Sequence, residues 1–220
     1  MPALTPSRYF IPDLSPEFRS ELKRARVRWV FVAESPHTSE VEPESAEQRR
    51  PLCGSAGRAW WKALGEILEQ DPSSDTSLER LLRICKNHGI AVMNAAQVPL
   101  DSKITKLFPK ADPLKALGFS KDPGKSYYKN QKASKGMKAA IDSLRRRLTH
   151  AAVRQADIYA LGNDAEWFVQ EALKENPKNL ERVKGKIAHP SAWWRRAGYF
   201  GKIAKEKLKE ILSKKQLAAI

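Results

Sequence analysis

The fold is decided by residues 27–37, Val27-Arg28-Trp29-Val30-Phe31-Val32-Ala33-Glu34-Ser35-Pro36-His37. Their unbroken apolar run, rich in β-branched and aromatic residues, is typical of a strand buried on both faces of a sheet. Pro36 then removes a backbone donor and turns the chain. Polar groups at the carboxyl end of a central parallel strand are where open α/β sheets bind ligands. The stretch predicts a strand followed by either a ligand site or an ordinary polar turn.

Length and charge narrow the class of protein. The chain has 220 residues and a formal net charge of +15, which favours one large α/β domain and a polyanionic partner, most simply nucleic acid. A lysine-rich surface that serves solubility is the alternative. No stretch has the apolar length of a membrane span and no signal peptide is evident, so we expect a cytoplasmic, nucleoid-associated monomer without membrane contact. Cys53 and Cys85 are too few for a four-thiolate site, so neither a metal nor a cofactor is expected.

Alternating strands and helices predict the architecture. Residues 1–26 are expected to form a proline-containing arm that leads into a short helix over 16–25, followed by a single domain over 27–220. The order of elements favours a three-layer α/β/α sandwich around a central, mainly parallel four-stranded sheet. Besides the opening strand, the expected strands are 89–97, 157–161 and 186–191, and the expected helices follow residue 58 and cover 77–87, 133–148, 164–174 and 198–214.

Polar residues stand at or just after the ends of these strands. Because parallel strands end at one edge of the sheet, their side chains can converge there. Asn94 interrupts an apolar run, and its carboxamide suits either neighbouring backbone groups or the edge of a nucleobase. Gly54 and Gly57, before a helix, allow backbone amides to approach an anion or a planar ligand, although such loops often only pack against a sheet. The residues at strand ends are Glu34, Ser35, His37, Asn94, Asn163 and His189.

Three segments differ strongly in charge. Residues 101–150 carry 13 Lys and Arg against four Asp, and their first part, near 101–132, is a basic insertion with interleaved aromatic residues. That mixture suits phosphate contact and base stacking, or a solvated surface. Trp193-Trp194-Arg195-Arg196 offers stacking surfaces beside phosphate anchors, unless the tryptophans are buried under the last helix. Residues 38–50, with Glu40 among four glutamates, are expected to form a mobile loop that repels phosphates.

Five segments resemble, in order, motifs of the uracil-DNA glycosylase superfamily. Asn94 falls where that family's strand asparagine reads the base edge, and the likeness spans about residues 28–212. Val32-Ala33-Glu34-Ser35-Pro36-His37 resembles the water-activating loop, and Pro51-Leu52-Cys53-Gly54-Ser55-Ala56-Gly57 is similar to the Pro-Phe-x-Gly-x-Ala-Gly loop of the iron–sulfur branch. Leu161-Gly162-Asn163-Asp164-Ala165 resembles the third-strand Leu-Gly-x-x-Ala motif, and His189-Pro190-Ser191 matches the His-Pro-Ser motif.

The resemblance implies hydrolysis of the N-glycosidic bond of uracil, or of another deaminated base, flipped out of single- or double-stranded DNA. It implies that His189 stabilises the departing base and that Glu34 or Ser35 places water or offsets charge on the sugar. Asn94 would select the base edge. The other implied residues are Ala33, His37 and Leu52 at the base, and Ser191, Trp193, Trp194, Arg195, Arg196, Lys125 and Lys129 at the DNA.

Some positions depart from the family pattern. Ser35 stands where many members carry Asp or Asn, Leu52 replaces the aromatic residue that stacks on uracil, and His37 replaces a small or aromatic residue. The cluster cysteines are absent, so no iron–sulfur cluster is expected. Two functions remain: a monofunctional DNA glycosylase, or a nucleic-acid-binding relative with lost or altered catalysis. A third, a nucleotide-processing enzyme with a small substrate, leaves the positive charge unexplained.

Overall fold

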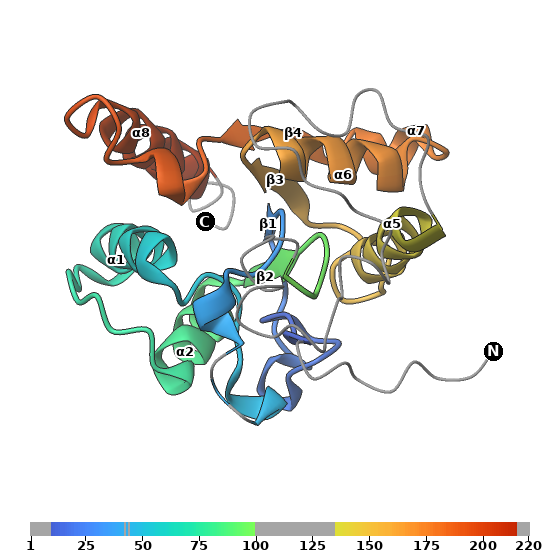
Figure 1. Ribbon diagram of the computed structural model, residues 1–220, viewed down its shortest axis with the longest axis horizontal. Coiled ribbons are helices and arrows are strands. Elements are labelled where there is room, and N and C mark those ends of the chain that lie inside the picture. Colours follow the sequence, from blue (N-terminus) through green and yellow to red (C-terminus); the bar gives the residue numbers. More distant parts are fainter. Residues whose placement is uncertain (1–9, 42, 44, 100–134, 215–220) are drawn as a thin grey trace.

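The structure is a computed structural model that describes residues 10–41, 43, 45–99 and 135–214 (Figure 1). Lys125 and Lys129, with the whole of the expected basic insertion near 101–132, lie outside the described residues. Within the described ranges, four parallel strands form one sheet in the order β2-β1-β3-β4. The strands are β1 (Trp29–Ala33), β2 (Ile90–Asn94), β3 (Asp157–Leu161) and β4 (Val183–Ile187).

Helices cover both faces of this sheet, which confirms the predicted three-layer α/β/α sandwich (Figure 1). Successive side chains of a strand point to opposite faces, and β1 accordingly sends Phe31 into one core and Val32 into the other. The first core is closed by α1 (Ser55–Glu69), α2 (Leu78–His88) and α8 (Tyr199–Lys214), and the second by α5 (Lys135–Leu148) and α6 (Asn163–Leu173). None of the described helices combines the length and apolar character needed to cross a membrane.

Several elements differ from the sequence prediction at their ends. The last strand, β4, begins and ends earlier than the expected 186–191. The sequence misplaced it because it is an edge strand whose lysines interrupt any apolar run. Between α6 and β4 the chain forms a short unpredicted helix, α7 (Pro177–Leu180). The expected helix over 16–25 is only a 3₁₀ turn, η1 (Ser20–Leu22).

The chain before β1 packs on the sheet. Leu14 forms an isolated antiparallel bridge with Val92 of β2, and its side chain is fully buried. The backbone N–H of Ile11 donates to the carbonyl of Gln97 at 2.9 Å. Residues 11–14, assigned by the sequence to an N-terminal arm, therefore cover the outer edge of β2 along the described part of the chain.

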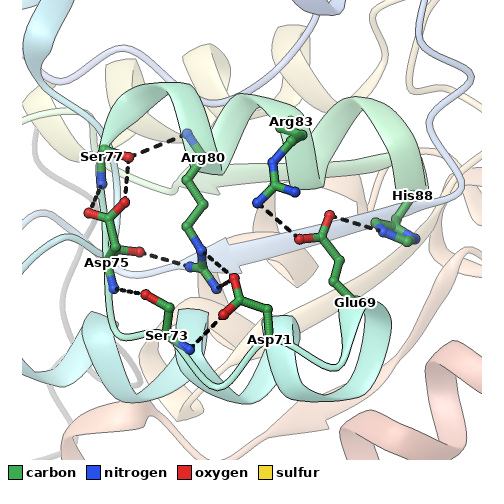
Figure 2. Close-up of polar contacts among 8 residues, drawn as sticks. All are labelled: Glu69, Asp71, Ser73, Asp75, Ser77, Arg80, Arg83 and His88. Carbon is green, nitrogen blue, oxygen red and sulfur yellow. Dashed lines mark hydrogen bonds and ion pairs between the residues drawn. The ribbon is translucent and has the colours of Figure 1, made fainter.

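The connection between α1 and α2 is fixed by charged groups (Figure 2). The buried Arg80 donates from Nε to Asp71 at 3.1 Å and from Nη1 to the carbonyl of Asp75 at 2.8 Å. At the end of α1, Glu69 lies 3.2 Å from Arg83 and 3.5 Å from His88, both on α2. These contacts hold α1 and α2 together on the face of the sheet against which both helices pack.

Candidate functional site

A cavity of about 200 Å³ opens at the carboxyl edge of the sheet. Its walls come from three separate segments: the turn after β1 with Glu40, the loop and first turn of α1 from Leu52 to Gly57, and the segment after β4 with His189 and Ser191. The structure therefore brings together most of the residues that the sequence placed at strand ends. Of the predicted catalytic and base-binding residues, the lining includes Glu34, Ser35, His37, Leu52 and His189.

The turn after β1 is held against the end of β2 by two backbone bonds. The carbonyl of Ala33 accepts the N–H of Ala95 at 2.7 Å, and the carbonyl of Glu34 accepts the N–H of Ala96 at 2.9 Å. Glu34 and Ser35 consequently leave the sheet half-buried, where they line the cavity. His37 is exposed, and its Nδ1 lies 3.0 Å from the hydroxyl of Ser39.

Glu40 is the lining residue that the sequence did not single out. Its side chain is 4% exposed, and Oε2 accepts the backbone N–H of Leu52 at 3.2 Å. Burial raises the pKa of Glu40 to about 8, and hydrogen bonds from the N–H groups of Leu52, Gly54 and His37 counter part of that rise. A buried titratable carboxyl in a cleft is typical of functional sites.

The prediction of a mobile loop over 38–50 is wrong for its buried part. Glu40, Val41 and Arg49 are each at most 5% exposed. The Arg49 guanidinium donates from Nε to the carbonyl of Pro43 at 2.6 Å, and Arg19 donates to the carbonyl of Glu47 at 2.7 Å. Mixed charge without periodicity concealed these contacts, because they join arginine side chains to main-chain carbonyls. Val41, the one apolar residue beside Glu40, was the available signal.

The loop before α1 has a strained backbone. Leu52 is buried with φ of 60°, a left-handed conformation that is unfavourable for a branched apolar residue. Gly57 packs against it so closely that a Cβ there would overlap the Leu52 carbonyl group. Helix α1 then starts at the cavity with Gly54 as its N-cap. First-turn N–H groups have no intrahelical acceptor and carry partial positive charge, so this wall favours an electron-rich group.

His189 is fixed by the residues that follow it. The backbone N–H of Ser191 donates to Nδ1 at 3.1 Å, and the Ser191 hydroxyl lies 2.7 Å from the same atom. Burial lowers the pKa of His189, Arg195 acts in the same direction, and Asp164 opposes both. With Nδ1 accepting, the neutral ring carries its proton on Nε2, which makes Nε2 a hydrogen-bond donor.

Two predicted base-binding residues do not line the cavity. Ala33 and Asn94, neighbours in the register of β1 and β2, are each 1% exposed. The side-chain oxygen and nitrogen of Asn94 have no hydrogen-bond partner among the described residues. Its backbone is bound instead, by Asp13 at 3.2 Å and by Arg147 at 2.8 Å. The carboxamide is thus buried and is not part of the cavity lining.

The segment after His189 divides its tryptophans between core and surface. Trp193 is 4% exposed, and its Nε1 donates to the carbonyl of Ala188 at 2.9 Å. Of the two interpretations of this loop, burial therefore holds for Trp193. Trp194 is 57% exposed, and Arg195 and Arg196 beside it are also exposed. Arg196 lies 5.4 Å from the ring centre of Phe200.

No cysteine is among the residues that line the described cavity. Cys85 is fully buried in the core, and Cys53 is half-buried with a pKa raised to about 11 by burial. Within the described ranges, no three His, Cys, Asp or Glu side chains gather closely enough to hold a metal ion. The chemistry available in the cavity is that of carboxyl, imidazole and hydroxyl groups.

Comparison with known proteins does not assign the chain to a family. No protein-family model matches the chain, and no curated protein matches it in sequence.

Proposed function

We propose that the protein is a monofunctional DNA glycosylase, which hydrolyses the N-glycosidic bond of uracil or another deaminated base in base excision repair. The observation that carries the proposal is a single cavity that holds a neutral imidazole donor, His189, and a second group for the sugar or water, Glu34. The proposed partner is DNA, bound by a monomer in the cytoplasm at the nucleoid.

The residues of the cavity suit the charges that develop in this reaction. When the bond between C1′ and the base nitrogen breaks, the base takes the bonding electrons and the sugar becomes oxocarbenium-like. The N–H at Nε2 of His189 would stabilise the negative charge on a base oxygen. The Glu34 carboxyl, which also lines the cavity, would offset positive charge on the sugar or orient the water that adds to C1′.

The size and surroundings of the cavity support a flipped base as ligand. Its 200 Å³ fall below the range of about 300–1,000 Å³ usual for drug-sized ligands, so the cavity suits one ring system rather than a nucleotide. Such a base reaches an enzyme pocket only outside the stack. Trp194, Arg195 and Arg196 begin three residues after the cavity residue Ser191, where they would stack on bases and bind phosphates.

A second candidate function is DNA binding without base release. It is favoured by the position of Asn94, whose carboxamide is buried away from the cavity lining. The aliphatic Leu52, where an aromatic residue would stack on a base, favours it as well.

The test is base release from labelled oligonucleotides that carry uracil, hypoxanthine or xanthine, each single-stranded and paired. Wild type is compared with His189→Ala and Glu34→Gln. His150→Ala is the matched control, because its Nδ1 also accepts the N–H of the second following residue, Ala152, at 3.3 Å, but on an exposed turn outside the cavity lining. Release that collapses in His189→Ala and persists in His150→Ala supports the glycosylase. Salt-sensitive DNA binding without release from any substrate supports the second candidate.

A further inference from the structure

We infer that Glu40 determines specificity in this cavity, by presenting a neutral carboxyl group whose O–H donates a hydrogen bond to a carbonyl oxygen of the bound base. The inference rests on the proposed function, because it names the atom that the ligand offers to the site. It gives a role to a buried acidic residue that neither the catalytic scheme nor the sequence motifs use.

Glu40 joins two walls of the cavity. Oε2 accepts the N–H of Leu52 from the loop before α1, and the backbone N–H of Glu40 itself donates to the carbonyl of His37 at 2.9 Å. A Cβ at Gly54 would lie 3.6 Å from Oε1, an ordinary van der Waals distance, so the carboxyl group packs beside the N-terminus of α1 at the cavity lining. The carboxyl group is therefore held between two backbone segments, the turn after β1 and the loop before α1.

Within the described part of the chain, the Glu40 carboxyl forms no ion pair. Arg50 is the cation that acts on it, but Arg50 donates from Nε to the carbonyl of Thr76 at 2.7 Å. Cys53, from the same loop, is a thiol that burial keeps protonated. The other titratable lining groups are Glu34 and His37 from the turn after β1, and His189 from the segment after β4. Burial without a close counter-ion is why the pKa of Glu40 rises to about 8.

A protonated carboxyl group distinguishes bases by whether one substituent accepts or donates a hydrogen bond. It has one O–H donor, and its remaining lone pairs suffice for the N–H groups of His37, Leu52 and Gly54. Deamination replaces an exocyclic amino group, a donor, by a carbonyl oxygen, an acceptor. The neutral acid pairs with the carbonyl group, whereas an ionised carboxylate would pair with the amino group. A buried donor left unpaired by the wrong base costs binding free energy, so the neutral acid selects the deaminated base.

The test is the pH profile of kcat/KM for release of uracil between pH 6 and pH 10. For wild type we expect a fall of tenfold per pH unit above about pH 8, as Glu40 loses its proton. Glu40→Gln keeps an N–H donor in nearly the same volume, so its rate at pH 7 is expected within tenfold of wild type and this fall is expected to disappear. Ionisation of the base itself affects both proteins equally. Glu47→Gln, the same substitution at an exposed site of the same loop, retains the wild-type profile.

A Glu40→Gln profile that falls like wild type would overturn the inference. If Glu40→Gln does not fold, ¹³C NMR of the carboxyl carbons in wild type replaces it: we expect one glutamate to titrate near pH 8, and a Glu40 ionised throughout pH 5–9 would also overturn the inference. If wild type releases no base, the proposed function fails separately. The inference is then tested by binding of uracil- and cytosine-containing single strands: a uracil preference at pH 7 that vanishes at pH 9.5 supports it, and equal binding at both pH values refutes it.

Discussion

Nη1 of Arg147, on α5, lies 2.7 Å from Oδ2 of Asp13, which is 134 positions earlier in the chain. Both side chains are at most 2% exposed. The pair also binds the end of β2: Asp13 accepts the N–H of Asn94, and Arg147 donates to the carbonyls of Asn94 and Ala95. The ion pair therefore fixes where β2 leaves the sheet, next to the turn that lines the cavity.

Arg147→Met is expected to lower the free energy of unfolding by about 3–5 kcal/mol, because it leaves the Asp13 carboxyl buried without its counter-ion. Urea unfolding followed by far-UV circular dichroism measures the change. The double variant Asp13→Leu/Arg147→Met is expected to recover most of the loss, since neither charge then remains in the core. Arg146→Met, exposed on the same helix, is the control and should cost less than about 0.5 kcal/mol. A cost that small in Arg147→Met would show that the pair contributes nothing to stability.

Gly57→Ala is expected to displace the wall of the cavity that contains Leu52. The added Cβ overlaps the Leu52 carbonyl, and backbone on both sides leaves little room to yield, so we expect a loss of about 3 kcal/mol and weakened ligand binding. Gly198→Ala is the comparison: its φ of 83° imposes about 1–2 kcal/mol of strain, but no described atom lies within 4 Å of the new Cβ. Thermal unfolding and oligonucleotide binding should rank Gly57→Ala as the more harmful. Equal losses would mean that close approach to Leu52 is unimportant.

The adjacent tryptophans are expected to respond in opposite ways. Trp193→Ala should destabilise the protein by about 3–5 kcal/mol, because it empties a buried site and removes the bond to Ala188. Trp194→Ala should change stability by less than about 0.5 kcal/mol and weaken single-stranded DNA binding by about 5- to 150-fold, the usual loss of one stacked base. Calorimetry and fluorescence anisotropy separate the two effects. Unchanged DNA affinity in Trp194→Ala would exclude it from the proposed interface.

The fold was predictable because its first two strands consist almost entirely of apolar residues that are buried on both faces. Runs such as Trp29–Ala33 and Ile90–Asn94 leave few alternatives to a buried parallel sheet, and the carboxyl ends of the strands then share an edge. The edge strand Val183–Ile187 was misplaced, because its lysines face solvent and break the pattern.

Long-range polar contacts were not predictable from the sequence. Arg145, Arg146 and Arg147 are the same residue type, yet only Arg147 forms an ion pair with Asp13, because its position on α5 faces the sheet. Glu40 was hidden for a similar reason among four glutamates of one loop. Its burial depends on N–H groups of Leu52 and Gly54, which come from a segment that begins more than ten residues later. Motif and spacing identify a strand end, but they do not identify which distant backbone group reaches it.

Glu40 is expected to make folding less favourable as pH rises. Its pKa of about 8 in the folded protein exceeds the ordinary value of 4.5 for an unfolded chain, so between these values the folded state keeps a proton that the unfolded state has lost. The stabilisation is complete below about pH 4.5 and is lost as pH rises through about 8. At 1.4 kcal/mol per pH unit, the whole effect is on the order of 3–5 kcal/mol.

The measurement is the difference in unfolding free energy between wild type and Glu40→Gln, determined by urea titration at pH 5, 7 and 9. Other titrating groups are common to both proteins, so they cancel in this difference. We expect wild type to lose stability relative to Glu40→Gln at each step towards pH 8 and to change little beyond it. The difference between wild type and Glu47→Gln, at an exposed carboxyl, should stay flat across the same range. A flat difference for Glu40→Gln as well would mean that the three N–H donors keep Glu40 ionised throughout, and that the cavity presents an acceptor where a donor is inferred.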